Sequence, residues 1–192
     1  MIYNKIKIII LVLVIIFVIY YMLNYIKDMA NNTPNIAIAF FDTEKIKGTV
    51  HFTEDLFNND VSIDIDLYSK FKNSDHGFHV HQAGDLTDGC TSACAHFNPY
   101  NSKHGGPESN ERHVGDLGNI HFNSLGRCRQ TFSDKMIKLR GYKSNILGRM
   151  LVIHEDRDDL GKGNNKESLI TGNAGKRVTC AVIGYSKKMF KK

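Results

Sequence analysis

The stretch Val61-Ser62-Ile63-Asp64-Ile65-Asp66-Leu67 alternates apolar and polar side chains at every step. Because successive side chains of a strand point to opposite faces, this alternation predicts a half-buried β-strand. Weaker runs of the same kind occupy residues 36–41, 48–52, 77–81, 136–139, 150–154 and 178–183, and no segment after residue 30 sustains a helical period. Seven or so short strands separated by turn residues predict an antiparallel β-sandwich or flattened barrel.

Two segments interrupt this pattern because they are long, polar and rich in glycine; they cover residues 82–118 and 155–177. Each begins directly after a predicted strand that ends in a histidine, His81 for the first and His154 for the second. Loops of this length without regular structure are uncommon in compact domains and usually carry function. The two loops therefore mark the predicted functional site.

His79 and His81 stand one residue apart on the predicted strand 77–81, so both imidazoles project from the same face. From one rigid strand they can bind a single metal ion. Further potential ligands follow at His96, His104, His113, Asp116 and His154. Imidazole suits zinc and copper, and a carboxylate beside histidines favours zinc. The pattern predicts a centre that holds two metal ions.

The first 30 residues form a separate segment. Residues 6–26 are apolar almost throughout, with Lys7 and Asn24 as exceptions, and as a helix they would measure roughly 30 Å, the thickness of a bilayer core. We expect residues 1–30 to form an uncleaved transmembrane anchor. A cleaved secretory signal is the alternative, disfavoured by the length of the run and by Asp28 in the nearest cleavage motif.

Flanking charges predict the orientation of this anchor. Lys5 and Lys7 precede most of the span, whereas Lys27 after it is offset by Asp28. The positive-inside rule then places the following domain on the lumenal or extracellular side. Residues 31–35 read as a polar, proline-containing linker, and residues 36–192 as one domain.

Charge and cysteine content limit the partners. The formal charge is +5, but no basic run or aromatic stacking platform accompanies it, so nucleic-acid binding has little support. Mild positive charge suits a small anionic substrate better. The four cysteines form no C-x-x-C pair, so a thiolate zinc site is not expected. Whether Cys94 and Cys128 form a disulfide or stay free is open.

Motifs along the domain resemble, in the same order, those of the copper/zinc superoxide dismutases. They are Gly-Phe-His-Val-His at 77–81, Gly-Cys-Thr-Ser-Ala at 89–93, His-Phe-Asn-Pro at 96–99, Lys-His-Gly-Gly-Pro at 103–107, the run 111–119, and the segments 148–155, 158–163 and 171–177. The similarity spans residues 36–185. It implies an all-β Greek-key barrel with two active-site loops, here preceded by one transmembrane helix.

The resemblance also implies a ligand set. Copper would be held by His79, His81, His96 and His154, and zinc by His96, His104, His113 and Asp116. His96 would bridge the ions and carry a proton during catalysis. In this family copper cycles between oxidation states and converts superoxide to dioxygen and hydrogen peroxide, while zinc has no redox activity and fixes geometry.

Five further positions take their expected roles from the family. Arg177 would attract the anionic substrate beside copper, because a guanidinium is always charged. Thr171 would narrow the channel opposite it. Asp158 would hydrogen-bond ligand histidines of both metals and orient them. Cys90 and Cys180 would form a disulfide.

The sequence departs from the family at several points. In the second loop Lys166 replaces a usual acidic residue and Ile170 a usual lysine. Because of Tyr185 and the lysine-rich tail, the formation of a homodimer is left open. Whether copper loading needs a chaperone is also open. The alternative function is a non-enzymatic copper/zinc-binding module or metallochaperone on the same fold. Such relatives tend to lack some ligands or the arginine, and this chain has all of them.

Overall fold

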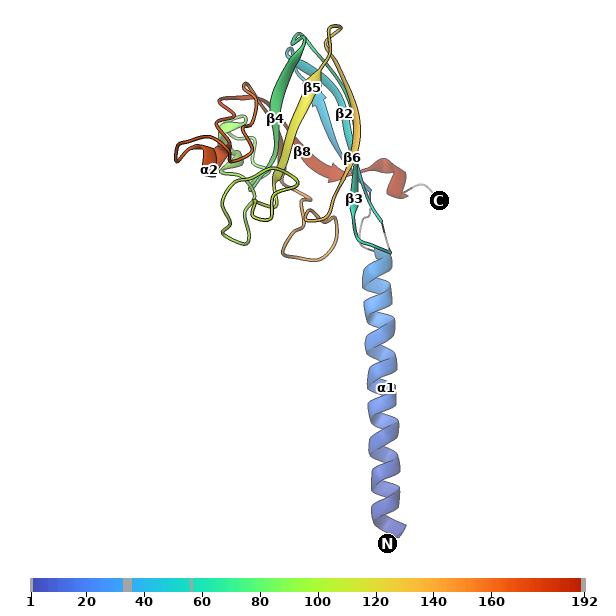
Figure 1. Ribbon diagram of the computed structural model, residues 1–192. Helices are drawn as coiled ribbons and strands as arrows, with labels where there is room; N and C mark the ends of the chain where they lie inside the picture. Colours follow the sequence, from blue (N-terminus) through green and yellow to red (C-terminus); the bar gives the residue numbers. More distant parts are fainter. Residues whose placement is uncertain (1, 33–35, 56, 191–192) are drawn as a thin grey trace. The chain divides into compact units, whose positions relative to one another are not determined.

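The computed structural model describes residues 2–32, 36–55 and 57–190. The chain divides into two compact units, Met1–Pro34 and Asn35–Lys192. The first unit holds the helix α1 (Ile2–Asn32), and the second holds eight strands (Figure 1). The strands are β1 (Ile36–Asp42), β2 (Ile46–Glu54), β3 (Val61–Ser69), β4 (Ser74–His81), β5 (Asp116–Phe122), β6 (Arg127–Asp134), β7 (Met150–His154) and β8 (Arg177–Tyr185).

Helix α1 contains one stretch, Lys7–Ile26, that is long and apolar enough to cross a membrane. Its large apolar side chains from Ile8 to Ile26 are exposed. The helix continues through Asn32, so Asn31 and Asn32 of the predicted linker are helical. Residues 33–35 of that linker lie outside the described part of the chain.

The eight strands form one antiparallel sheet in the order β5-β4-β7-β8-β1-β2-β3-β6. Its two outer strands, β5 and β6, are consecutive in the chain and joined by a tight turn in which Asn123 N–H donates to the Arg127 carbonyl (3.0 Å). The sheet thus curls into a nearly closed barrel. Connections from β3 to β4 and from β6 to β7 cross between its halves, which is the Greek-key arrangement. The predicted all-β fold is confirmed.

The barrel interior is filled by the apolar side of each strand. On β3 the four apolar residues Val61, Ile63, Ile65 and Leu67 are fully buried, as their alternation predicts. Phe41, Phe52, Phe78 and Phe122 meet them from other strands. Burying one such side chain contributes roughly 1.5–3 kcal/mol, so this core supports the loops that it carries.

Six of the seven predicted strands are present, and the one at 136–139 is wrong. Ile137 and Leu139 are buried, which explains the alternation, but no neighbouring strand pairs with this segment. Carboxylates accept its backbone N–H groups instead: Asp134 Oδ1 bonds Ile137 N (2.9 Å) and Glu54 Oε2 bonds Leu139 N (3.1 Å). The segment is a loop held by side chains.

Strands β5 and β6 are absent from the sequence prediction. The inward positions of β6 are Cys128, Gln130, Phe132 and Asp134. Burial therefore alternates along the strand, but apolar and polar residues do not. β5 begins at Asp116, which reads as part of a ligand-bearing loop. The first long loop therefore ends at residue 115, and the second covers 155–176. These loops contain short helical turns at Thr91–Ala93 and Ser168–Thr171.

Candidate metal centre

Strand pairing brings three of the predicted ligands together. His79 on β4 lies opposite Asp116 at the start of β5, and β7, which pairs with the other side of β4, ends at His154. The pairing shifts register next to His79 and next to His154, and such bulges re-aim the side chains beside them. Gly77 leaves the room for this, because a Cβ there would lie 2.8 Å from the Ala174 methyl.

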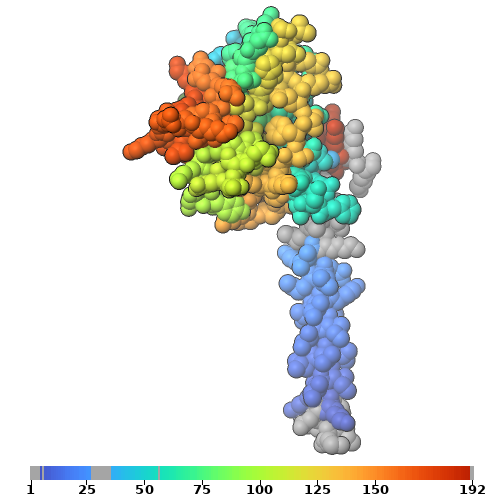
Figure 2. Space-filling model, in the orientation of Figure 1, coloured from blue at the N-terminus to red at the C-terminus, as the bar shows by residue number. Residues whose placement is uncertain are grey.

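The first loop supplies the remaining ligands because backbone bonds hold it against the barrel. The backbone of His96 forms an isolated antiparallel β-bridge with that of His81, and Phe97 N–H donates to the Val80 carbonyl (2.8 Å). His104 N–H donates to the carbonyl of Leu169 in the second loop (2.9 Å), so the two loops pack together. Figure 2 shows both loops side by side on one face of the strand unit, in green and orange.

One cluster consists of His79, His81, His96 and His154 and is called the four-histidine group; all four are buried. Nδ1 of His81 lies 2.9 Å from the Cys94 carbonyl, and Nδ1 of His154 lies 3.2 Å from the Gly175 carbonyl. These nitrogens must carry the ring protons, because a carbonyl only accepts. The two Nε2 atoms, 3.2 Å apart, then face each other as lone pairs. Two facing lone pairs fit an electron acceptor between them.

His79 completes this pattern. Its Nε2 donates to Asp158 Oδ2 (2.9 Å), which leaves its buried Nδ1 without a partner. The buried Nε2 of His96 has no partner either. An unpaired buried polar atom costs roughly 1–3 kcal/mol, and a metal ion bound by these nitrogens would remove that cost. The nitrogen donors suit copper.

A second cluster, the Asp116 group, consists of His96, His104, His113 and Asp116. Their Nδ1 atoms lie 2.8, 3.0 and 3.1 Å from Asp116 Oδ1. His104 Nδ1 makes no hydrogen bond despite this distance. Three imidazoles around one carboxylate oxygen match the ligand set of a tetrahedral zinc site. His96 belongs to both groups, so its ring lies between the two potential metal positions.

The pKa values of the four-histidine group favour metal binding. Burial, reinforced by neighbouring histidines, lowers the pKa of His81 to about 2 and those of His96 and His154 to about 3. These rings therefore stay neutral near pH 7 and keep lone pairs for a metal. A metal ion can therefore bind these rings without first displacing a proton from them.

The Asp116 group has the opposite electrostatics. Burial alone would raise the pKa of Asp116, but the adjoining histidines hold it far below its usual value. Burial alone would lower the pKa of His104, but the carboxylates of Asp116 and Asp158 raise it to about 9. A dication here would displace a proton from His104 and take over its role beside the carboxylates.

Asp158 connects the two groups. Its Oδ2 accepts from His79 (2.9 Å) and its Oδ1 from His104 (2.8 Å), and it is fully buried. Burial would raise the pKa of Asp158, but these histidines lower it to about 2, so it stays charged. Asn119 holds its backbone: the Asn119 side chain accepts from Asp158 N–H (2.7 Å) and donates to its carbonyl (2.9 Å).

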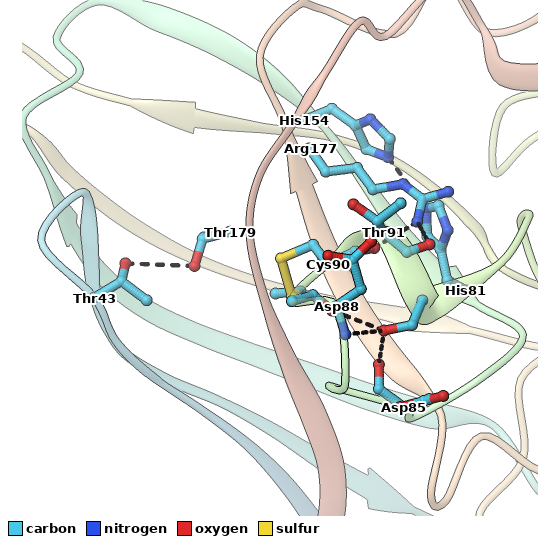
Figure 3. The surroundings of a disulfide bond; sticks show 12 residues. Thr43, His81, Asp85, Asp88, Cys90, Thr91, His154, Arg177 and Thr179 are labelled. Carbon is cyan, nitrogen blue, oxygen red and sulfur yellow. Dashed lines mark hydrogen bonds between the residues drawn. A yellow bond between two sulfur atoms is a disulfide. The ribbon is translucent and has the colours of Figure 1, made fainter.

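Arg177 lies beside the four-histidine group and is held by the first loop. Its guanidinium donates to the carbonyls of Cys90, Thr91 and Cys94. The disulfide Cys90–Cys180 ties this part of the loop to β8, three residues from Arg177. Figure 3 shows the arginine next to the imidazoles of His81 and His154. Cys94 and Cys128 are free thiols.

A cavity of about 500 Å³ opens at this point. Its lining includes His81, His96, His154, Thr171 and Arg177. Of the two departures from the family in the second loop, Lys166 and Ile170, it is Ile170 that lines the cavity. A charged guanidinium among neutral imidazoles makes the cavity suited to a small anion.

Each residue predicted for the site lies in or beside this centre. Sequence reasoning gave no role to three supporting residues, although Arg112 and Asn119 lie within the run 111–119. Asn119 holds Asp158; Arg112, fully enclosed, donates to the Asp116 carbonyl (2.8 Å); and Glu167 accepts from Thr171 Oγ1 (2.7 Å). Their roles depend on contacts between segments far apart in the chain, so no local signal reveals them.

Fold and donor geometry define the class: a Greek-key β-barrel metalloprotein in which one histidine is shared by two potential metal sites. The family model for copper/zinc superoxide dismutase matches residues 46–183. The chain is 59% identical over 157 residues to the Cu-Zn superoxide dismutase of Paramecium bursaria Chlorella virus 1, covering 82% of each chain. It is 46% identical over 159 residues to the extracellular Cu-Zn superoxide dismutase of Drosophila melanogaster, covering 80% and 87%.

The crystal structure of the clock protein EA4 superposes with a TM-score of 0.77 at 42% identity, covering 81% of this chain and 97% of that one. The chain therefore belongs to the copper/zinc superoxide dismutase family. It is an oxidoreductase of that family, with copper and zinc as its cofactors and superoxide as its substrate.

Proposed function

We propose that the four-histidine group holds copper and the Asp116 group holds zinc, with His96 between them. The observation that carries this assignment is the donor geometry: nitrogen lone pairs converge in the first group, and three imidazoles surround one carboxylate oxygen in the second. Copper, when bound, supplies the one-electron chemistry by which two superoxide ions and two protons become dioxygen and hydrogen peroxide, while zinc contributes fixed charge.

The protein's own residues position the substrate and the proton. Arg177 presents a permanent positive charge to the cavity and so draws superoxide toward the four-histidine group. Nε2 of His96, the nitrogen without a protein partner, would be a copper ligand and, when free of the metal, the atom that could take up a proton and deliver it to the reduced product. Thr171, held by its hydrogen bond to Glu167, narrows the cavity to the size of a small anion.

Asp158 connects the two proposed metal sites. By accepting from His79 Nε2 and His104 Nε2, it turns the Nδ1 atoms of both rings toward the metal positions. Hydrogen-bond partners of this kind orient metal-binding histidines and raise their basicity. The disulfide Cys90–Cys180 and the three carbonyls that accept from Arg177 fix the position of its guanidinium in a similar way.

The first experiment is superoxide dismutation by residues 31–192, with copper and zinc counted in the same sample, for the wild type and for Arg177→Ala. We expect about one ion of each metal per chain, rapid turnover in the wild type, and a slower rate with unchanged metal content in Arg177→Ala. Full metal loading without turnover would identify a non-enzymatic binding module. Loss of metal in Arg177→Ala would show that the arginine supports the ligands instead of the substrate.

We further propose that α1 anchors the domain in a membrane, with the domain on the lumenal or extracellular side. The apolar stretch of α1, the lysines before it and the extracellular relative support this. A secreted form after signal cleavage is the alternative. Intact mass of the membrane-extracted protein and protease protection of the domain in sealed vesicles distinguish them.

A homodimer and a copper chaperone are the remaining proposed partners. Tyr185, exposed at the end of β8, lines an apolar groove with Leu147 and Val182, and the exposed ring of Phe190 lies 6.3 Å from the Tyr185 ring. Sedimentation of residues 31–192 tests self-association. Copper uptake from free salt, without a helper protein, tests whether a chaperone is needed.

A further inference from the structure

Two of the seven arginines are partly buried and lack a carboxylate partner. Four others pair with an aspartate or glutamate, and Arg129 is exposed. Arg149 and Arg177 form no ion pair among the described residues, and burial lowers the pKa of both guanidinium groups. Arg177 lines the cavity beside the four-histidine group, and Arg149 lines a second cavity of about 370 Å³, here called the Arg149 cavity.

The walls of the Arg149 cavity come from the first loop and from the loop between β6 and β7, residues 135–149. Its lining includes Gln82, Phe97, Asn98, Tyr142, Lys143 and Arg149. No aspartate or glutamate of the described chain lines it. A hydrogen bond between the hydroxyls of Tyr100 and Ser144 (3.1 Å) joins the two loops beside it.

The guanidinium of Arg149 is fixed without being neutralised. Its Nη1 donates to the Gln82 carbonyl (2.6 Å) and its Nε to the Asn145 carbonyl (2.8 Å). The ring centroid of Phe97 lies 3.5 Å from the guanidinium carbon, so one face of the group is covered. Nη2 has no hydrogen-bond partner in the described part of the chain. Arg177 is likewise held by backbone carbonyls, and in both cases the charge remains available to an anion.

Lys143 and Tyr142 add a second charge and a free aromatic ring. The Nζ of Lys143 lies 4.3 Å from the ring centroid of Tyr100, a cation–π contact that leaves the charge in place. Tyr142 is 96% exposed, so the protein covers neither face of its ring. The cavity therefore combines two cations with an aromatic surface on which a flat group can stack.

We propose that the Arg149 cavity binds a phosphate monoester that carries an aromatic ring, as a nucleoside monophosphate does. The charges of Arg149 and Lys143 match the charge of about −1.5 to −2 on a phosphate monoester at pH 7, and a guanidinium suits phosphate oxygens. The aromatic ring of the ligand stacks on Tyr142. The volume of the cavity falls within the range of about 300–1,000 Å³ that is usual for small-molecule sites.

The chain contains no tryptophan, so Tyr142→Trp in the metal-loaded full chain gives a fluorescent reporter at the cavity and keeps a flat ring there. The probes are adenosine monophosphate, adenosine and inorganic phosphate, because stacked adenine quenches tryptophan fluorescence. In this background Lys143→Ala removes one charge from the cavity. Lys135→Ala is the matched control, since Lys135 is exposed on the same loop but lines a different cavity. Dismutase activity checks the folding of each variant.

We expect saturable quenching by adenosine monophosphate, with a Kd that Lys143→Ala raises roughly tenfold and Lys135→Ala leaves unchanged. Adenosine should bind more weakly, and inorganic phosphate should compete only weakly. No quenching, or equal quenching by adenosine, would refute the phosphate contact, and competition by inorganic phosphate as strong as by the nucleotide would refute the contact with the ring. Quenching that is lost in Arg177→Ala but kept in Lys143→Ala would place the ligand at the metal centre and would also refute the proposal.

Discussion

Removing the disulfide should separate stability from substrate guidance in a single variant. The change is Cys90→Ser together with Cys180→Ser. The bond closes a loop of 90 residues, and on the chain-entropy model a loop of that length contributes roughly 4–5 kcal/mol to the free energy of unfolding. Since domains of this size are stable by only about 5–15 kcal/mol, the loss should be large but should leave a folded protein once metals bind.

The structure predicts a second effect that stability alone does not. The guanidinium of Arg177 is held by the carbonyls of Cys90, Thr91 and Cys94, and the disulfide is the covalent tie between this part of the loop and β8. Without it the loop can move and the arginine loses its fixed position. We therefore expect activity per bound copper to fall, even where copper and zinc contents match the wild type.

Two measurements check this reasoning: urea unfolding of the metal-free domain, and superoxide dismutation normalised to bound copper. Cys94→Ser is the control, because Cys94 is a free, exposed thiol and the substitution leaves the disulfide and the Cys94 carbonyl in place. We expect this control to match the wild type in both assays. An unchanged urea midpoint in the double variant would contradict the entropy argument. Wild-type activity per copper would contradict the proposed support of Arg177.

Three further outcomes follow from the site. Ile170→Lys should raise the rate at low salt and lose the gain at high salt, because it restores a charge at the cavity; the control Leu169→Lys, which does not line the cavity, should change little. Asp116→Ala should lower zinc more than copper when both are counted by mass spectrometry, and equal loss would overturn the ligand assignment. The urea midpoint of the metal-free domain should fall as pH drops from about 6.5 toward 3. The three histidines with lowered pKa in the four-histidine group take up protons more readily in the unfolded chain, so a flat profile would contradict their burial.

The parts of the fold that were predictable are those in which chemistry and period coincide. The alternation at Val61 to Leu67 predicts a strand because its inward side chains are all apolar. β6 also alternates inward and outward positions, but its two buried residues are Cys128 and Asp134. Its sequence therefore shows no alternation of apolar and polar residues. The false strand at 136–139 is the converse case, in which buried residues alternate but carboxylates replace the neighbouring strand.

The metal centre was predictable for a related reason. Only a few residue types bind metal ions, and their order along this chain resembles a family pattern. The predicted ligands, from His79 to His154, could therefore be named from the sequence. The residues that orient them could not, since Asn119 and Arg112 act through bonds to the backbone of Asp158 and Asp116. Such bonds depend on how loops pack, and a single sequence carries no period or spacing for them.

The two groups reach rigidity by different routes, and Asp158 is the link between them. His79, His81 and His154 belong to strands of a barrel whose core fixes their backbone. The loop ligands of the Asp116 group instead depend on the carboxylate itself, which without a metal faces a protonated His104. A metal in the Asp116 group would connect the loop histidines to Asp116 on β5, and Asp158, which accepts from both His104 and His79, links this group to His79. On the proposed assignment, three copper ligands are thus positioned by strands of the barrel, whereas the three histidines of the zinc site are positioned by the first loop.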